Sequence, residues 1–528
     1  MSQAGDALHE DAQPRVRWRI SSGALSVAIL WLLIAATFAV CRTRTGGTFV
    51  YPLDDSYIHL ALAKNIAEHG IYGVTPYEFT PTSSSIVWPL LLVAVRVVSA
   101  SDLIPLALNV VFASALALVV DRGLRRDGYG SRGRLVFGVA SLLAVPILPV
   151  VFIGMEHTLH ILAVVLLAQT TVHALAADRE RDGAREAKGV PVALGIGLLS
   201  LLATAARYES LFLVGVLGLL ALYRRRLSLA FALGIGAAVP VVAYALFSLA
   251  KGGPILPISV LLKRQEIGVW TFLPTLGRRF IENPHLLALL TLLSLGYVEA
   301  RARGLWDRRR LMLLVTASVI VLHITFAQTG WFFRYEAYTV ALALAALAGP
   351  LFEHRARLRE RLLPLALVML PVIVRGAGSL RAVPRASANI YEQQVQMARF
   401  AAQYYRGERL VVGDIGAVSY LADVRIVDLI GLGSPAVATL RLRGSLDLAA
   451  TDRLTRDASI AIVDEGYSPP PQWRRVGLWR TSGNTVCRDD AVAFYAVHPE
   501  EEARLTASLR EFSPQLPSTI EQSGTYTR

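Results

Sequence analysis

The feature that most constrains this chain is a series of long apolar stretches separated by short loops rich in arginine. Each stretch approaches the ~20 residues that an α-helix needs to cross a lipid bilayer. The chain has 528 residues, is 54% hydrophobic and has a mean hydropathy of +0.47, which is too apolar for a soluble protein. We therefore predict a polytopic α-helical membrane protein with about 11 spans, near 20–41, 103–121, 135–153, 158–177, 189–206, 208–223, 228–250, 284–300, 311–328, 337–352 and 362–376.

The positive charge of the chain fits a membrane protein better than a nucleic-acid binder. The net charge is +13, but the arginines gather in short clusters between the apolar stretches, as they do in cytoplasmic loops. These clusters share one side of the membrane only if the short apolar stretch 86–98 does not cross it. We therefore predict that 86–98 is a re-entrant or interfacial helix, that the N-terminus is cytoplasmic and that the C-terminal region lies on the outer face.

The chain changes character near residue 385, where span-length apolar runs end. Short β-like runs appear at 409–413, 425–429, 459–463 and 491–497, with a helical stretch at 391–405 before them. This pattern predicts a small C-terminal α/β domain outside the membrane. Two cysteines exclude a disulfide framework. The expected organisation is a cytoplasmic tail at 1–19, a membrane domain at 20–380 with its first outer loop at 42–102, an α/β domain at 385–511 and a disordered tail at 512–528.

The acidic pair Asp54-Asp55 follows the first expected span. One of the two could be the N-cap of a helix that runs from Ser56 to a C-cap at Gly70. A cap explains one carboxylate but not two at a membrane boundary, where charge is costly. We therefore expect at least one of them to act as a general base towards a hydroxyl group or to hold a cation.

Other polar and aromatic residues fall at the predicted outer boundaries, where they could line one cavity at membrane level. Each has an ordinary alternative: interfacial solvation for the acids and His157, snorkelling for the lysine and its neighbour, an aromatic belt near Arg334 and a turn at Asp414. Because Arg207 and Glu209 are two apart, we do not expect them to face each other on a helix. The candidate binding residues are Tyr57, Glu156, His157, Arg207, Glu209, Lys263, Arg264, Trp331, Arg334, Tyr335 and Asp414.

Several of these motifs, in this order, resemble the GT-C superfamily of integral-membrane glycosyltransferases. The similarity is greatest to the bacterial arabinofuranosyltransferase- and mannosyltransferase-like branch. It includes the acidic pair that opens an outer-loop helix and the Trp88-Pro89 entry. It also includes Gly154-Met155-Glu156, with His157 where that branch has threonine, Ala206-Arg207-Tyr208-Glu209, the segment from Leu256-Pro257 to Lys263-Arg264, and Asp414-Ile415-Gly416 through Asp428-Leu429-Ile430-Gly431.

The resemblance implies inverting transfer of a sugar from a polyprenyl-phosphate donor to a hydroxyl of a glycan, lipid or protein acceptor. It places the protein in the bacterial inner membrane, with the reaction on the outer face. Asp54 would be the base and Asp55 would orient it or the acceptor. The candidate ligands of the donor phosphate are Arg207, Lys263, Arg264 and Arg334.

The sequence contains no nucleotide-binding loop and no HExxH metal motif, and nucleic acid is not an expected partner. A divalent cation at the acidic pair is a candidate cofactor. Two other functional classes stay open at this point. A transporter or flippase of lipid-linked sugars would need a pathway open to both sides of the membrane, and a non-catalytic receptor would bind through the α/β domain without the acidic pair.

Overall fold

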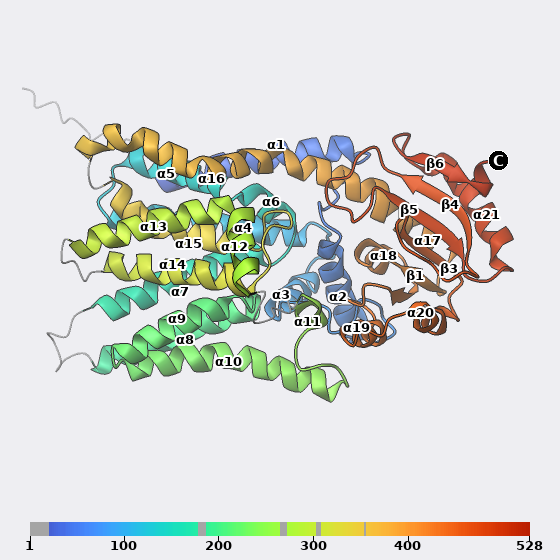
Figure 1. The fold of residues 1–528 in the computed structure, drawn as a ribbon, viewed down its shortest axis with the longest axis horizontal. Coiled ribbons are helices and arrows are strands. Elements are labelled where there is room, and N and C mark those ends of the chain that lie inside the picture. The colour runs from blue at the N-terminus through green and yellow to red at the C-terminus, as the bar shows by residue number, and fades with distance from the viewer. Residues whose placement is uncertain (1–20, 178–185, 264–271, 303–307, 353–354) are drawn as a thin grey trace, which may run out of the picture.

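The molecule is elongated, with a bundle of long helices at one end and an α/β domain at the other (Figure 1). The computed structural model describes residues 21–177, 186–263, 272–302, 308–352 and 355–528. The predicted cytoplasmic tail and Arg264 lie outside the described residues. Between the bundle and the α/β domain lie three short helices, α2 (Asp55–His69), α3 (Val87–Arg96) and α11 (Ile258–Leu262) (Figure 1).

The bundle is built from helices that have apolar residues on most of their surface, as expected for helices in lipid. Seven described helices are long and apolar enough to cross a membrane, and shorter apolar helices accompany them. The bundle helices are α1 (Ser22–Arg44), α4 (Ile104–Arg126), α5 (Ser131–Ala144), α6 (Ile147–Phe152), α7 (His157–Ala176), α8 (Glu186–Ala206), α9 (Ser210–Tyr223), α10 (Leu227–Ala250), α13 (Pro284–Ala302), α14 (Arg308–Phe326), α15 (Ala337–Phe352) and α16 (Arg355–Ile390), with α12 (Phe272–Glu282) at its edge.

Two helices differ from the simple span pattern. The predicted span 135–153 is divided into α5 and α6 at Pro146, because proline lacks the backbone N–H that a continuous helix needs. Helix α3 has 10 residues, which is about 15 Å at 1.5 Å per residue and therefore half of a bilayer core. It packs beside α2 at the end of the bundle that faces the α/β domain (Figure 1).

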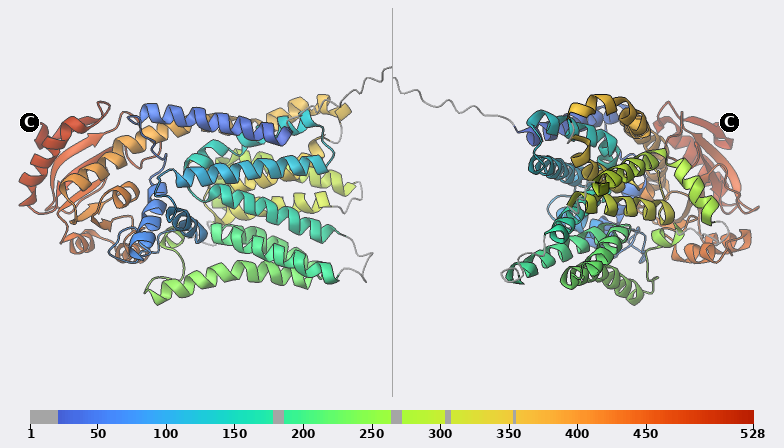
Figure 2. Two further views of the ribbon diagram at one scale, coloured as in Figure 1. Left: turned by 180° about the vertical axis from the view of Figure 1, so that it is seen from behind. Right: turned by 60° about the vertical axis from the view of Figure 1, so that its left-hand side comes forward.

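A continuous helical segment connects the bundle to the α/β domain. Helix α16 passes through a π-helical turn at Tyr391–Val395 into α17 (Gln396–Tyr404). Figure 2 shows this segment running along α1 and into the domain. The bundle and the α/β domain are thus connected by continuous helix from α16 to α17 rather than by a flexible linker.

The α/β domain contains a six-stranded mixed sheet in the order β2-β1-β3-β5-β4-β6. Strand β1 pairs in parallel with β2 and β3, whereas the pairs β3–β5, β5–β4 and β4–β6 are antiparallel. The elements are β1 (Arg409–Val412), α18 (Gly416–Leu421), β2 (Arg425–Asp428), α19 (Pro435–Leu442), α20 (Leu448–Thr455), β3 (Ile460–Asp464), β4 (Arg474–Arg480), β5 (Ala491–Ala496), α21 (Glu501–Phe512) and β6 (Glu521–Gly524).

Aromatic packing holds one face of this sheet to α17 and α21. Phe400, Trp479, Phe494 and Phe512 are almost completely buried, and the Trp479 and Phe494 ring centroids are 4.3 Å apart. Each such side chain contributes about 1.5–3 kcal/mol through burial. The predicted polytopic helical fold with a small C-terminal α/β domain is therefore confirmed.

The prediction of a disordered tail at 512–528 is wrong. Strand β6 pairs with β4, with Gln522 opposite Trp479. Tyr526, in the short helix Thr525–Thr527, is 2% exposed, and its hydroxyl accepts a hydrogen bond from Trp479 Nε1 at 3.0 Å. The polar composition of the segment concealed this element, although Phe512, Leu516, Ile520 and Tyr526 are all buried in the core.

Candidate active site

The acidic pair lies at the start of α2, between the bundle and the α/β domain. Asp54 occupies the N-cap position, but its side chain makes no capping bond, and Gly70 ends the helix in the left-handed conformation at φ 69°. The Asp54 carboxylate instead accepts hydrogen bonds from the backbone N–H groups of Gly416 and Ala417, at 2.6 and 2.8 Å. The simple capping interpretation is therefore right about the end of the helix and wrong about its start.

Asp55 points in a different direction and meets Arg334. Arg334 Nη2 donates to Asp55 Oδ2 at 2.5 Å, and Arg334 is 3% exposed, whereas the Asp55 side chain is 31% exposed. Burial raises the pKa of Asp55, but the positive charges of Arg334 and Lys263 outweigh burial and hold that pKa below its ordinary value. Asp55 is therefore an ionised carboxylate with accessible surface.

The two carboxylates differ in their electrostatics as well as in their partners. Burial and the neighbouring carboxylate of Asp414 raise the pKa of Asp54, while its two backbone N–H donors oppose that shift. Asp414 in turn accepts a hydrogen bond from Gln394 Nε2 at 2.7 Å. The structure thus brings the sequence-predicted Asp414 next to Asp54, on the side of the pair that faces the α/β domain.

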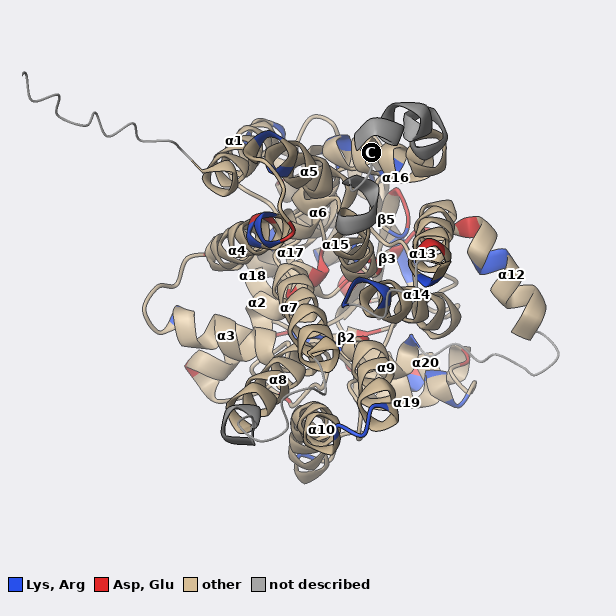
Figure 3. Ribbon diagram, turned by 90° about the vertical axis from the view of Figure 1, so that its left-hand side faces the viewer, with Lys and Arg blue, Asp and Glu red and all other residues tan. Residues whose placement is uncertain are grey.

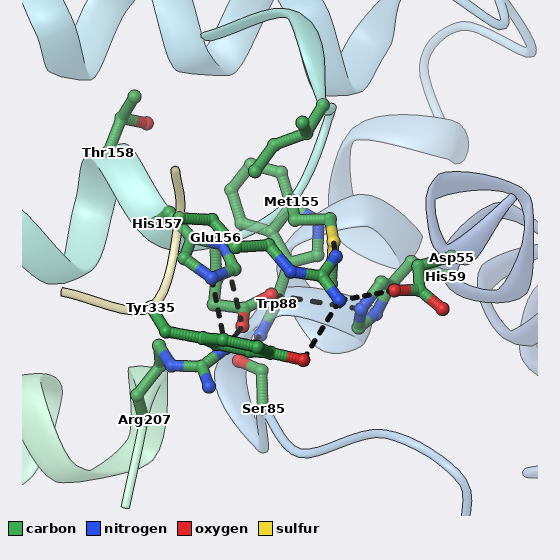
Figure 4. A network of polar contacts seen from close by, with 12 residues as sticks. Asp55, His59, Ser85, Trp88, Met155, Glu156, His157, Thr158, Arg207 and Tyr335 are labelled. Carbon is green, nitrogen blue, oxygen red and sulfur yellow. Dashed lines mark hydrogen bonds and ion pairs between the residues drawn. The ribbon is translucent and has the colours of Figure 1, made fainter. Parts of the chain in front are cut away.

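Three cations surround the ring of Tyr335. Arg334 Cζ lies 5.0 Å, Lys263 Nζ 5.2 Å and Arg207 Cζ 5.6 Å from the ring centroid. Figure 4 shows Tyr335 between Arg207 and Asp55, with its hydroxyl towards Asp55. Among the described residues Lys263 has no carboxylate within ion-pair distance. Lys263 therefore lies at the same ring as Arg334 and Arg207, and its positive charge also acts on Asp55.

Arg207 is held by two carboxylates. Its Nη1 donates to Glu156 Oε1 at 2.7 Å, and its Nε and Nη2 donate to Glu209 at 3.2 and 2.5 Å. The prediction that Arg207 and Glu209 do not face each other is wrong, because both lie in the turn between α8 and α9 rather than on a helix. Glu156 is completely buried, and His157 Nε2 lies 3.1 Å from Arg207 Nη1.

The turn before α7 places Glu156 and also contacts Arg334. Gly154 has a φ of 62°, and a Cβ at this position would lie 2.5 Å from the Tyr51 ring, so the close approach needs glycine. Trp88 Nε1 donates to the Gly154 carbonyl at 3.2 Å, and Arg334 Nη1 donates to Met155 Sδ at 2.9 Å (Figure 4). This turn therefore contacts two of the three cations around Tyr335 (the cation cluster): Arg207 through Glu156, and Arg334 through Met155.

The loop that carries Arg334 and Tyr335 has an unusual backbone. Trp331, Phe332 and Phe333 have φ values of 35°, 55° and 65°, in the left-handed region that such residues rarely adopt. Buried Glu336 pins this loop, since it accepts from Gly330 N–H at 2.8 Å and from Arg375 Nη2 at 2.5 Å. Strain of this kind persists where surrounding contacts determine the backbone.

Two candidates lie apart from the cation cluster. Trp331 is half exposed, and the described contacts do not connect it with Asp55. The Tyr57 hydroxyl accepts from the Tyr51 N–H at 3.2 Å, which ties Tyr57 to the segment before α2. Roles for both in substrate binding stay predictions.

Sequence reasoning missed several residues of the site. His59 lies one helical turn after Asp55, and its Nε2 is 3.7 Å from Glu156 Oε2. Its spacing of four residues from Asp55 on a helix was a usable signal. Gly416 belongs to a motif that the sequence singled out, but its contact with Asp54 was not foreseen, and no local signal pointed to Arg375. Within the described ranges, no group of three or more His, Cys, Asp and Glu side chains is arranged to hold a metal ion, and a divalent cation stays a candidate cofactor.

Comparisons with known proteins support the fold. A family model described as a domain of unknown function (DUF8728) matches residues 388–495, and no curated protein matches the sequence. The structure of ArnT from Cupriavidus metallidurans in the apo state is similar at 13% sequence identity and a TM-score of 0.50, and the structure bound to undecaprenyl phosphate at 14% and 0.51. Each match covers 90% of this chain and 99% of the ArnT chain. The chain therefore has a fold similar to that of ArnT, and membership of the GT-C superfamily and of its predicted branch stays a prediction.

Proposed function

We propose that this protein is a membrane glycosyltransferase that moves a sugar from a polyprenyl-phosphate donor to an acceptor hydroxyl. The observation that carries the proposal is the pairing, at one end of the bundle, of the accessible Asp55 carboxylate with the cations around Tyr335. A carboxylate base and anion-binding cations close to one another suit a displacement at an anomeric carbon. That an ArnT structure of the same fold binds undecaprenyl phosphate supports a lipid-phosphate donor.

We assign the base to Asp55 rather than to Asp54. Both Asp54 oxygens accept backbone hydrogen bonds and the pKa of Asp54 is raised, whereas the charges of Arg334 and Lys263 hold the pKa of Asp55 below its ordinary value. In the proposed step the acceptor oxygen attacks the anomeric carbon, Asp55 takes the hydroxyl proton, and the bond from that carbon to the phosphate oxygen breaks with its electron pair moving to the phosphate. A single displacement of this kind inverts the anomeric configuration.

The phosphate released in this step needs positive charge. Lys263 is the first candidate, because its ammonium group has no described carboxylate partner, whereas Arg207 is shared by Glu156 and Glu209. Arg334 is placed to orient Asp55 and to add positive charge at the same ring. Arg264 follows Lys263 directly and stays a candidate ligand outside the described residues.

We further propose that the site faces the outside of a bacterial inner membrane. Figure 3 shows Lys and Arg at helix ends on the side of the bundle away from the α/β domain; Arg125 and Arg126 are in the last turn of α4, and the arginines at 224–226 follow α9. The positive-inside rule places that side in the cytoplasm, so the α/β domain and the acidic pair lie outside.

Sugar transfer by purified protein in lipid nanodiscs, with a panel of synthetic polyprenyl-phosphate sugars and mixed acceptors, tests the proposal. We expect one donor to be consumed by the wild type and not by Asp55→Asn or Lys263→Gln. Asp423→Asn, which changes an exposed acid of the α/β domain that pairs with the exposed Arg406, is the matched control and should retain transfer. Donor that binds without being cleaved would instead favour the transporter, the alternative function.

A further inference from the structure

The α/β domain reaches into the membrane-proximal site at one point, where α18 meets α2. The N–H groups of Gly416 and Ala417 both bind the Asp54 carboxylate, although these residues are more than 360 positions apart in the sequence. The contact is close, because a Cβ on Gly416 would lie 2.0 Å from the Asp54 carbonyl oxygen. Glycine at 416 is therefore required for the carboxylate to reach the first turn of α18.

Further contacts along the same two helices keep them in register. Lys64 Nζ, on α2, donates to the Tyr420 carbonyl at 3.3 Å, and its ammonium group lies 5.8 Å from the Tyr420 ring centroid. The Tyr420 hydroxyl donates to Asp102, whose carbonyl accepts from the Tyr51 hydroxyl at 2.7 Å. Helix α18 is thus attached to both ends of the segment that carries the acidic pair.

The position of Asp54 decides the position of Asp55. The two residues are adjacent at the first turn of α2, so any rotation or shift of that turn moves both carboxylates together. From the same turn, Asp55 accepts its hydrogen bond from Arg334 Nη2 at 2.5 Å. A displacement of about 1 Å in a reacting group can cost about 100-fold in rate. The hydrogen bonds from the α/β domain to Asp54 therefore also fix the position of Asp55, the proposed base.

We propose that the α/β domain is a clamp for the catalytic helix, and that Asp54 is a positioning residue held by Gly416 and Ala417 rather than the base. The inference rests on the proposed function and gives a role to the region 388–495, which matches a domain of unknown function. It gives the two adjacent carboxylates different roles: Asp54 is bound to the clamp, and Asp55 faces Arg334 and acts as the base.

The test compares Gly416→Ala with Gly483→Ala. Gly483 lies in the same domain in open space, so its added methyl group meets nothing within 4 Å. Two readouts are made on the full chain in nanodiscs: steady-state transfer, and hydrogen exchange at the amides of 416–417 and of the first turn of α2. Asp54→Ala, which removes both acceptors at once, is measured beside them.

We expect Gly416→Ala and Asp54→Ala to lower kcat about 100-fold, with KM for the donor changed by less than about twofold. Exchange should rise at 416–417 and at the start of α2, while the sheet stays protected. Gly483→Ala should behave as the wild type does. Asp55→Asn should abolish transfer without changing exchange at 416–417, which separates chemistry from positioning.

Three results would overturn the clamp. In the first, Gly416→Ala retains full transfer. In the second, Asp54→Ala abolishes transfer while exchange at 416–417 stays as in the wild type, which would make Asp54 the base. In the third, exchange rises throughout the sheet, which would make the contact a requirement for folding. Failure of the wild type to transfer any sugar counts against the proposed function, whereas exchange tests the contact without substrate.

Discussion

Replacing Arg334 by glutamine is the change that most directly probes the charge balance of the site. Arg334 is almost completely buried, and its Nη2 donates to Asp55 Oδ2 at 2.5 Å. Glutamine keeps a donor of shorter reach and removes the positive charge. Because that charge lowers the pKa of Asp55, its loss lets burial dominate, and the pKa of Asp55 rises.

The size of this rise follows from the strength of the lost interaction. A hydrogen bond to a charged group contributes about 1.5–3 kcal/mol, and one pKa unit corresponds to about 1.4 kcal/mol. The pKa of Asp55 should therefore rise by about 1–2 units in Arg334→Gln. Since the base acts as its carboxylate, the acidic limb of kcat/KM should move upwards by the same amount.

The assay is kcat/KM for sugar transfer, measured between about pH 4 and pH 8 in nanodiscs for the wild type, Arg334→Gln and Arg475→Gln. Arg475, on β4 of the α/β domain, forms an ion pair with Glu465, and this pair is partly exposed. Its loss should leave the profile unchanged, because exposed pairs contribute little. An acidic limb that does not move in Arg334→Gln would refute the assignment of Asp55 as the base.

Two further predictions concern stability. Glu156→Gln should lower the free energy of unfolding by about 3 kcal/mol, since it breaks a buried pair with Arg207. In thermal unfolding in detergent, the melting temperature should fall further than it does for Glu209→Gln, whose carboxylate is 20% exposed. Equal falls in the two variants would contradict the argument. Burial raises the pKa of Asp428 from 3.8 to about 6, so the folded state binds the proton more tightly and this carboxyl group stabilises the fold least at high pH. Its contribution of about 3 kcal/mol should be lost as the pH rises from about 4 to about 6, and Asp428→Asn should flatten the pH dependence of unfolding by that amount; a profile unchanged by the substitution would exclude Asp428 as its source.

The elements were predictable where local pattern decides structure. The runs at 409–413, 425–429, 459–463 and 491–497 are strands within a residue or two, because alternating or continuous apolar residues fill both faces of a covered sheet. Strands β4 and β6 were missed, since β4 carries three arginines and β6 lies at an edge. Pro146 divides one predicted span because proline lacks a backbone N–H, and counting apolar residues does not detect such a break.

The candidate site was predictable in membership but not in pairing. The residues that meet around Tyr335 come from three separate segments, and each was recognisable as a polar or aromatic residue at a span boundary. Their partners depend on contacts between distant segments, such as Arg334 with Asp55 over 279 positions. The different roles proposed for Asp54 and Asp55 rest on such a contact, between Asp54 and α18. Without the position of α18, the sequence does not distinguish the roles of the two carboxylates.

The central claim is that Asp55, with the cations around Tyr335, transfers a sugar from a lipid phosphate. The most direct test is consumption of a polyprenyl-phosphate sugar by the wild type and by Asp55→Asn, with both proteins shown to be folded by their thermal unfolding in detergent. The account predicts that the wild type alone forms product and that its anomeric configuration is inverted. Equal product from Asp55→Asn, or product with retained configuration, would contradict it.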